Sequence, residues 1–134
     1  MQTFLPYDNF RTSAMVLDRQ RLGKQRVETL QILNALMGLS DGWRNHPATR
    51  MWAGYEGALW FYGQTMIGEW VRRGYQNNMV LPGNFKPADI TFPAWLGDPA
   101  FHASHRSNLL RKDPLHYNQF GWTEPSDLAY VWPV

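Results

Sequence analysis

Apolar residues recur at steps of three and four between about Thr12 and Met37, which predicts an amphipathic helix over most of this stretch. The apolar face holds Leu22, Leu30, Leu33, Leu36 and Met37. The opposite face gathers Arg21, Lys24, Gln25, Glu28 and Gln31. Asp18 is a favourable N-cap, so residues 12–17 form either the start of this helix or a separate turn ahead of it. The helix therefore presents one polar side that carries several functional groups.

A second helical segment is delimited by its end signals. Pro47 suits the first helical position, and Gly74 follows two arginines that complement the C-terminal end of the helix dipole. About 27 residues lie between these signals, which predicts one long central helix. Its four glycines, at positions 54, 57, 63 and 68, would weaken it unless another helix packs closely against them. We therefore expect a close helix crossing.

The rest of the chain predicts a long loop and a third helix. Residues 75–99 are rich in proline, glycine and asparagine, which indicates an ordered loop region held down by its aromatic residues. A helix is expected over residues 100–112, with Asp98 as its cap and Pro99 in its first turn. The sequence thus predicts an all-α fold, a single compact domain over residues 1–134 with about three helices and long ordered loops.

Composition narrows the class of protein. With 44% hydrophobic and 18% charged residues, the chain suits one globular domain, and no apolar run is long enough to span a bilayer. The start lacks the basic and apolar regions of a signal peptide, so we expect a cytoplasmic protein with no membrane partner. The absence of cysteine removes disulfides, thiol nucleophiles and cysteine-based metal sites.

The basic and aromatic residues favour an anionic partner. Ten arginines stand against three lysines, and arginine binds phosphate through two parallel hydrogen bonds and stacks on bases. The chain also contains seven tryptophans, more than a small core normally needs. Proteins that stack nucleic-acid bases use aromatic surfaces of this kind. Composition therefore raises nucleic-acid binding as one candidate function.

The first helix carries the strongest chemical pattern. Arg21, Lys24 and Glu28 are separated by three and four residues, so one carboxylate lies beside two cations on one face. In a phosphate-binding cleft this carboxylate could move protons, and Lys24 could form a Schiff base. An exposed, salt-bridged helix face is the alternative interpretation. Arg26 falls among the apolar positions, where it either reaches back to the surface or points into a polar pocket.

Residues 42–47 (GWRNHP) precede the predicted second helix and offer donors to a phosphate. The candidate contacts are Arg44, Asn45 and His46. In the structural alternative, Trp43 belongs to the core, Asn45 or His46 caps the helix, and Pro47 begins it. The two interpretations explain the segment about equally well.

The third helix has no acidic residue and is expected to form a DNA-phosphate surface. Its candidate contacts are His102, His105, Arg106, Arg111 and Lys112. The two histidines have the spacing of metal ligands, but no third ligand stands at a plausible spacing, so we expect no metal site. In the tail, Tyr117 and Trp122 either stack on bases or pack the C-terminus onto the helices, and packing is favoured for Phe120 and Trp122.

Taken together, these segments resemble the pyrimidine-dimer DNA glycosylase family. The resemblance rests on the order of four strings: 17–28 (LDRQRLGKQRVE), 42–47 (GWRNHP), 69–75 (EWVRRGY) and 117–122 (YNQFGW). It implies a compact all-α domain and a cofactor-free glycosylase that also acts as an abasic-site lyase. It further implies double-stranded DNA with damaged or modified pyrimidines as the partner, in a sharply bent form, and a monomeric, nucleoid-associated protein of bacterial or phage-like type.

The resemblance also implies roles for individual residues. The nucleophile would be the N-terminal α-amine, Glu28 would assist the proton transfers, and Arg21 and Arg26 would grip phosphates. An α-amine has a reference pKa of about 7.7–8.0, so roughly a tenth or more is neutral at pH 7. The family's nucleophile is a small second residue exposed by removal of Met, whereas Gln2 is bulky and should leave Met1 in place. Met1 is therefore the expected nucleophile, with Lys24 as the substitute.

Two other functions remain open at this point. The first is a non-catalytic DNA-binding module that keeps the surface for bent DNA without the amine chemistry, and it predicts binding without strand scission. The second is an enzyme that acts on free modified nucleotides or bases in the same Glu28 pocket. That enzyme would show little salt-dependent affinity for duplex DNA.

Overall fold

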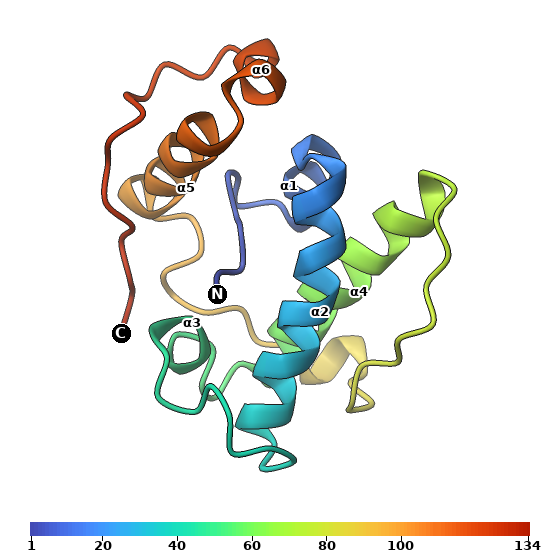
Figure 1. Cartoon of the computed structure of the whole chain (residues 1–134). Helices are drawn as coiled ribbons and strands as arrows, with labels where there is room; N and C mark the ends of the chain where they lie inside the picture. The colour runs from blue at the N-terminus through green and yellow to red at the C-terminus, as the bar shows by residue number, and fades with distance from the viewer.

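The computed structural model describes residues 1–134 as an all-helical chain without strands (Figure 1). The longer helices are α2 (Arg19–Leu36), α4 (Glu56–Arg72) and α5 (Pro99–Lys112). The short helices are α1 (Phe10–Val16), α3 (Pro47–Arg50), α6 (Pro114–Tyr117), and the 3₁₀ helices η1 (Pro87–Asp89) and η2 (Asn118–Phe120). The all-α prediction is confirmed, and the three long helices fall within the three predicted helical regions. Of the short helices, α1 precedes α2, α3 and η1 lie between the long helices, and α6 and η2 follow α5.

A cap separates α1 from α2. Asn9 caps α1 by accepting a hydrogen bond from the Thr12 amide at 2.9 Å. Leu17 is extended, which ends α1, and the carboxylate of Asp18 then accepts from the Arg21 amide to begin α2. Of the two interpretations of residues 12–17, the separate turn of helix is therefore confirmed.

The single helix predicted between Pro47 and Arg73 is wrong. The chain forms the four-residue α3, breaks over residues 51–55, and resumes as α4. Gly54 adopts φ +84°, a left-handed conformation that a helix interior cannot contain and that glycine adopts without steric cost. The break lets α3 and α4 take different directions (Figure 1).

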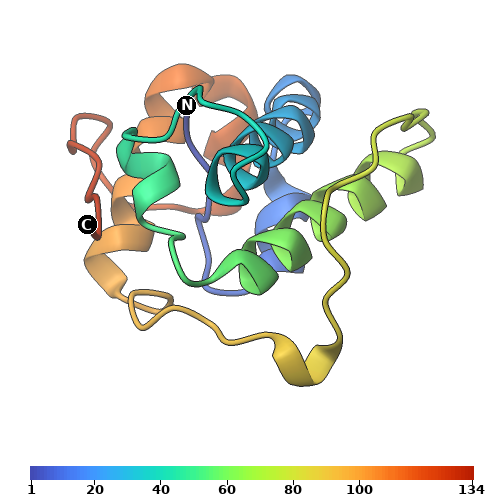
Figure 2. The same cartoon turned by 90° about the horizontal axis from the view of Figure 1, so that it is seen from below.

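The central helices α2 and α4 cross closely, as the glycine pattern predicts. In Figure 1 α4 passes behind α2. In Figure 2, seen from below, α2 accordingly lies above α4. At Gly63 an added Cβ would lie 2.5 Å from Thr29 Cγ2 and 2.5 Å from Leu81 Cδ1. The close approach confirms the crossing at this position. Side chains around the crossing, among them Leu22, Ile32, Leu33, Leu59, Tyr62 and Met66, are fully buried.

Residues 75–98 form the predicted ordered loop and sweep in a wide arc beside α4 before α5 begins (Figure 1). Aromatic contacts attach the loop to the helices. Phe85 packs against Trp60 with ring centroids 5.9 Å apart, and Trp95 Nε1 donates to the Met51 carbonyl at 3.1 Å. At the end of the loop Asp98 caps α5 and Pro99 occupies its first turn, as predicted. No helix in the chain has both the length and the apolar character needed to cross a membrane.

The N-terminal segment passes through the middle of the molecule between α5 and α2 (Figure 1). Residues 2–5 are each less than a tenth exposed although they form no helix. Unpaired backbone groups are costly in such a place, so other parts of the chain must supply their hydrogen bonds. The groups that do so define the candidate site.

Candidate active site

Side chains of α2 and α4 hold the first four residues of the chain. The Phe4 amide donates to Gln25 Oε1 at 2.7 Å, and Gln25 Nε2 donates to the Gln2 carbonyl at 2.9 Å. From α4 the Tyr62 hydroxyl lies 2.9 Å from the Phe4 carbonyl. The buried Trp52 indole adds a bond to the Thr3 hydroxyl at 3.0 Å. The register of this segment relative to α2 is therefore fixed by hydrogen bonds and not by apolar contact alone.

Helix α5 holds the next two residues with side chains that the sequence predicts as DNA contacts. The Leu5 amide donates to His105 Nδ1 at 2.9 Å, and the Leu5 carbonyl lies 2.8 Å from His102 Nδ1. Arg106 donates to the Pro6 carbonyl at 2.7 Å and pairs with Glu124 at 2.8 Å. Both histidines are buried, so phosphate cannot reach them. His102, His105 and Arg106 bind the N-terminal segment and are not placed as a DNA surface.

The tautomers of these histidines follow from their partners. An amide can only donate, so His105 Nδ1 accepts from Leu5 and carries its proton on Nε2. His102 Nε2 accepts from the Gly97 amide at 2.9 Å, which leaves the proton on Nδ1 for the Leu5 carbonyl. Full burial, together with repulsion by His102, lowers the pKa of His105 to about 3, and burial lowers the pKa of His102. Both rings are neutral at pH 7.

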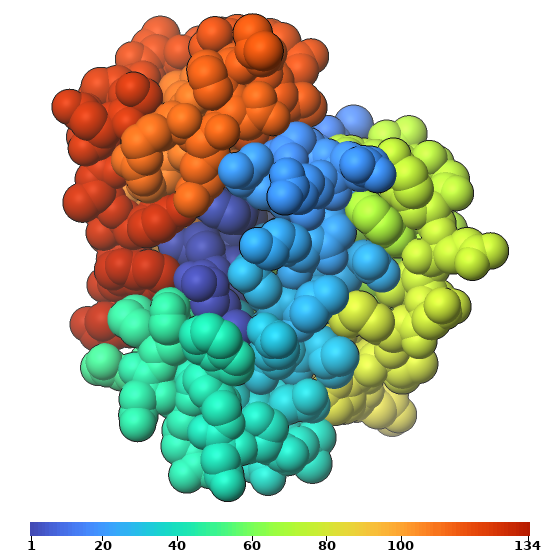
Figure 3. Space-filling view, viewed as in Figure 1, coloured from blue at the N-terminus to red at the C-terminus, as the bar shows by residue number.

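The buried segment delivers Met1 to a polar cleft of about 250 Å³. The cleft is lined by Met1, Gln2, Phe4, Gln20, Arg21, Lys24, Gln25, Glu28, Lys112 and Tyr130. In Figure 3 the N-terminal residues lie in a hollow bordered by α2, the region of α3, α5 and the C-terminal tail. Met1, Lys24 and Glu28, the three predicted catalytic residues, are thus brought to one cleft, together with Arg21 and Lys112.

The electrostatics of the cleft favour an anion beside a single carboxylate. Arg21 and Lys24 come from α2 and Lys112 from α5, while Glu28 is the one acidic side chain of the lining. Partial burial and repulsion by neighbouring cations, including Arg21 and Lys24, lower the pKa of Lys112, and Glu28 opposes this shift. A bound phosphate would relieve the repulsion between these cations.

Arg21 is held in place by Asp18. Arg21 Nη1 lies 3.2 Å from the Asp18 carboxylate, which also accepts from the Tyr117 hydroxyl at 2.5 Å. Burial acts to raise the pKa of Asp18, but the hydrogen bonds from Tyr117 and Arg21 outweigh it and leave the pKa below its usual value. Asp18 therefore stays ionised and orients Arg21 at the edge of the cleft.

The tail follows the packing interpretation and not the stacking one. Tyr117 is fully buried, and its ring stacks on Trp122 at 5.5 Å between centroids. The indole of Trp122 donates to the Tyr7 hydroxyl at 2.8 Å. With its face covered and its hydroxyl bound to Asp18, Tyr117 is not available to a base.

Three other predicted contacts lie outside the lining of the cleft. Arg26 packs over the Trp70 ring at 4.3 Å and donates to Asn77 Oδ1 at 2.6 Å, so it does not point into the cleft that contains Glu28. Arg44 is exposed and pairs with exposed Asp41 at 3.1 Å. Arg111 is exposed and donates to Asn108 on its own helix.

The loop before α3 follows the structural interpretation of residues 42–47 in part. His46 caps α3 through Nδ1, which accepts from the Ala48 amide at 3.0 Å, and Pro47 begins the helix. Partial burial and the positive Met1 amine lower the pKa of His46, which places this ring near the terminus. Asn45 is exposed and forms no cap. Trp43 is 47% exposed at φ +65°, so the core placement of Trp43 is wrong.

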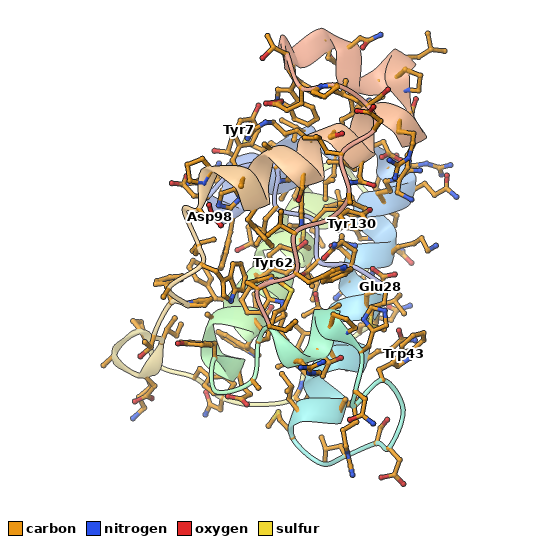
Figure 4. All side chains as sticks on the ribbon, turned by 90° about the vertical axis from the view of Figure 1, so that its left-hand side faces the viewer. Tyr7, Glu28, Trp43, Tyr62, Asp98 and Tyr130 are labelled. Carbon is orange, nitrogen blue, oxygen red and sulfur yellow. The ribbon has the colours of Figure 1, made fainter.

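Sequence reasoning missed the roles of Gln25 and Tyr130, which line the cleft, and of Tyr62, which bonds to Gln25 from α4. Figure 4 labels Tyr62 and Tyr130 together with Glu28. Tyr130 lies in the C-terminal tail and lines the cleft opposite α2, and burial raises its pKa to about 12. Gln25 stands on the predicted polar face but is almost completely buried. Only its spacing of three from Glu28 in the sequence could have indicated a contact between the two side chains.

A larger cavity of about 600 Å³ lies between α1, α4 and Phe92, and none of the predicted site residues lines it. Two acidic residues, Asp8 and Glu69, line it, and Glu69 is already paired with Arg72 at 2.6 Å and Arg73 at 2.7 Å. No group of three or more acidic or histidine side chains is placed to hold a metal ion anywhere in the chain.

Comparison with known proteins yields one match. The sequence model of a family described as pyrimidine dimer DNA glycosylase matches residues 1–82, which is more than half of the chain. No curated protein and no solved structure matches the chain. The matched region contains the buried N-terminal segment, α2 with Lys24 and Glu28, and the α4 helix.

Proposed function

Because the chain belongs to the pyrimidine dimer DNA glycosylase family, we propose that it excises damaged pyrimidines from duplex DNA and cleaves the resulting abasic site. One observation carries this proposal beyond the family: residues 2–6 are held by buried polar side chains so that Met1 reaches the cleft that contains Glu28. A buried segment without regular secondary structure needs other residues to satisfy its backbone hydrogen bonds. Several side chains do this here, and the result is that the chain terminus lies in the cleft that contains the Glu28 carboxylate.

In the proposed first step the neutral Met1 amine attacks C1′ of the damaged nucleotide. The bond between C1′ and the base nitrogen breaks, and the base leaves with its bonding electron pair and takes up a proton. The C1′–O4′ bond then breaks with its electron pair on O4′, which opens the sugar ring. The amine nitrogen gives up two protons, which balance those taken up by the base and by O4′, and a C=N bond forms between Met1 and C1′. The reference pKa of an α-amine, about 7.7–8.0, is lower than that of lysine, about 10.4, so an α-amine is neutral more often at pH 7 and suits this reaction better.

In the second step Glu28 removes a proton from C2′ of the opened sugar. The electron pair moves to form the C2′–C3′ double bond, and the 3′ phosphate leaves with the electrons of its C3′–O bond. Water then hydrolyses the C=N bond and frees Met1. Two observations support this role for Glu28: it lines the same cleft as Met1, and it receives a hydrogen bond from Gln25 at 2.9 Å.

The cations of the cleft supply the phosphate contacts in this proposal. Arg21, Lys24 and Lys112 surround the reacting groups from two helices. Each can neutralise a phosphate that flanks the damaged nucleotide, and the leaving phosphate gains most from this charge. Lys24 is also the substitute nucleophile, because it lines the same cleft.

Incision of a synthetic duplex that carries one cis-syn thymine dimer tests the proposal. We compare the chain beginning at Met1 with a variant that carries one glycine ahead of Met1. The added residue moves the amine by one position, so we expect strand scission to fall by about 10²-fold or more while duplex affinity changes by only a few fold.

Each other outcome favours a different interpretation. Unchanged scission by the extended variant would remove Met1 as nucleophile and leave Lys24. Salt-sensitive duplex binding with no scission by either protein would favour the non-catalytic DNA-binding module. Failure of both proteins to bind duplex DNA would favour an enzyme of free nucleotides or bases.

A further inference from the structure

The side chain of Gln25 connects the two groups that the proposed reaction brings together. Gln25 is 1% exposed in the middle of α2. Its Nε2 donates to the Gln2 carbonyl and to Glu28 Oε2, each at 2.9 Å. Its Oε1 accepts from the Phe4 amide at 2.7 Å and from the Tyr62 hydroxyl at 2.5 Å. All four hydrogen-bonding positions of the amide are therefore used.

The partners fix the orientation of this amide. A backbone N–H can only donate and a carbonyl or carboxylate oxygen can only accept, so Oε1 must face Phe4 and Nε2 must face Gln2 and Glu28. In a flipped amide, Oε1 would face the oxygens of Gln2 and Glu28, and Nε2 would face the donors of Phe4 and Tyr62. Glu28, the Gln2 carbonyl and the Phe4 amide are thus held in one arrangement by one rigid group.

We propose that Gln25 is a positioning residue that holds the N-terminal segment in register with Glu28, so that the terminal amine and the carboxylate meet the same sugar. The proposal rests on the proposed function and adds a residue to it. Gln25 touches no reacting atom itself. It acts through the Gln2 carbonyl, one residue from Met1, and through the carboxylate of Glu28.

The chemistry of the position requires an amide. A carboxylate here would keep the two acceptor bonds to Phe4 and Tyr62, but it would place negative charge against Glu28 and the Gln2 carbonyl. An apolar side chain of the same length would fill the space and leave the Phe4 amide, the Gln2 carbonyl and Glu28 without these partners. Tyr62 supports the amide from α4 and binds nothing of the cleft besides Gln25 and the Phe4 carbonyl.

The first test compares Gln25→Met with Gln31→Met, a control of the same residue type on the same helix outside the cleft. Both variants are checked by circular dichroism and thermal unfolding. The rate of borohydride-trappable adduct formation is then measured in single turnover on a duplex with one abasic site. We expect Gln25→Met to slow adduct formation by about 10- to 100-fold with duplex affinity within about threefold of the parent, and Gln31→Met to leave both unchanged.

The second test reads the terminus without DNA, so it is independent of whether the protein is a lyase. Reductive methylation with ¹³C-formaldehyde labels the Met1 amine, and its NMR signal is followed against pH. If Gln25 holds the terminus in place, the pH titration of this NMR signal changes in Gln25→Met and stays the same in Gln31→Met. An unchanged signal in folded Gln25→Met overturns the positioning role, and a parent protein that forms no adduct overturns the proposed function instead.

The variant Gln25→Glu tests the contact with Glu28 through the pH–rate profile, which would not change if Gln25 had a merely structural role. The new carboxylate keeps the two acceptor bonds and takes the place of a donor 2.9 Å from Glu28. Two neighbouring carboxylates cannot both ionise easily, so we expect the acid limb of the pH–rate profile to shift to higher pH. A profile that superimposes on the parent's would overturn the contact between Gln25 and Glu28.

Discussion

Glu28 shares the cleft with Met1 and is the only acidic side chain in its lining. Replacing it by Gln keeps the shape and removes the base, so we expect turnover on dimer-containing duplex to fall by about 10² to 10⁴-fold. The affinity for the duplex should stay within a few fold, because the phosphate contacts come from the cations. Single-turnover incision and equilibrium binding measure the two effects, and full activity of Glu28→Gln would remove this residue from the mechanism.

At the scale of residues, the sequence correctly predicts that Arg21, Lys24 and Glu28 share one face of α2. It wrongly predicts that the histidines of α5 form an exposed basic surface. The i, i+3 and i+7 spacing of Arg21, Lys24 and Glu28 places these side chains on one face whatever the fold. In the sequence, His102 and His105 belong to a helix without acidic residues, which resembles an exposed basic surface. Periodicity does not reveal that the N-terminal segment covers this face of α5. Their bonds join residues about one hundred positions apart, and no local pattern encodes such a contact.

At the scale of elements, the crossing of α2 and α4 helps to set the position of the cleft, because α2 carries two of its three cations and α4 carries Tyr62, which supports Gln25. The glycines predict that crossing, but they do not distinguish Gly63, which lies at the contact, from Gly54, which lies in the break between α3 and α4. Gly63 and Gly54 differ in backbone conformation and in whether another helix packs against them. Neither can be derived from one stretch of sequence.

The crossing predicts opposite effects for two substitutions in α4. Alanine at position 63 would force Thr29 and Leu81 away from a Cβ only 2.5 Å distant, so we expect a loss of about 1–3 kcal/mol in the free energy of unfolding. Alanine at position 68, where no atom lies within 4 Å, should gain about 0.5–1 kcal/mol through helix propensity. Urea unfolding of both variants measures the difference, and equal effects would contradict the packing described for this crossing.

At the scale of the whole molecule, the buried histidines make stability depend on pH. The pKa of His105 is about 3 in the folded protein and about 6.5 when unfolded, so the unfolded chain binds more protons between these values. Stability is therefore complete above about pH 6.5 and falls as the pH drops toward 3, by up to about 1.4 kcal/mol per pH unit for this group. Denaturant unfolding at several pH values, with an NMR titration of His105, checks this. A His105 signal that titrates near 6.5 would contradict it.

Binding of duplex DNA should depend on salt to an extent set by the cleft cations. Each phosphate contact contributes about −0.9 to the slope of log affinity against log salt concentration, so Arg21, Lys24 and Lys112 together give a slope of about −2.7. Lys112→Met should reduce the slope by about one, because it removes one contact. Fluorescence anisotropy over a range of salt concentrations measures both slopes. An identical slope for the variant would place Lys112 outside the DNA contacts.

The central claim is that the chain delivers its terminal amine to the sugar of a damaged nucleotide. The most direct measurement is borohydride trapping on a duplex with one abasic site, followed by mass mapping of the covalent adduct. We expect a single adduct on the α-nitrogen of Met1. An adduct on Lys24 would keep the lyase reaction and contradict the role of the terminus, and the absence of any adduct on a duplex that the protein binds would contradict the amine mechanism as a whole.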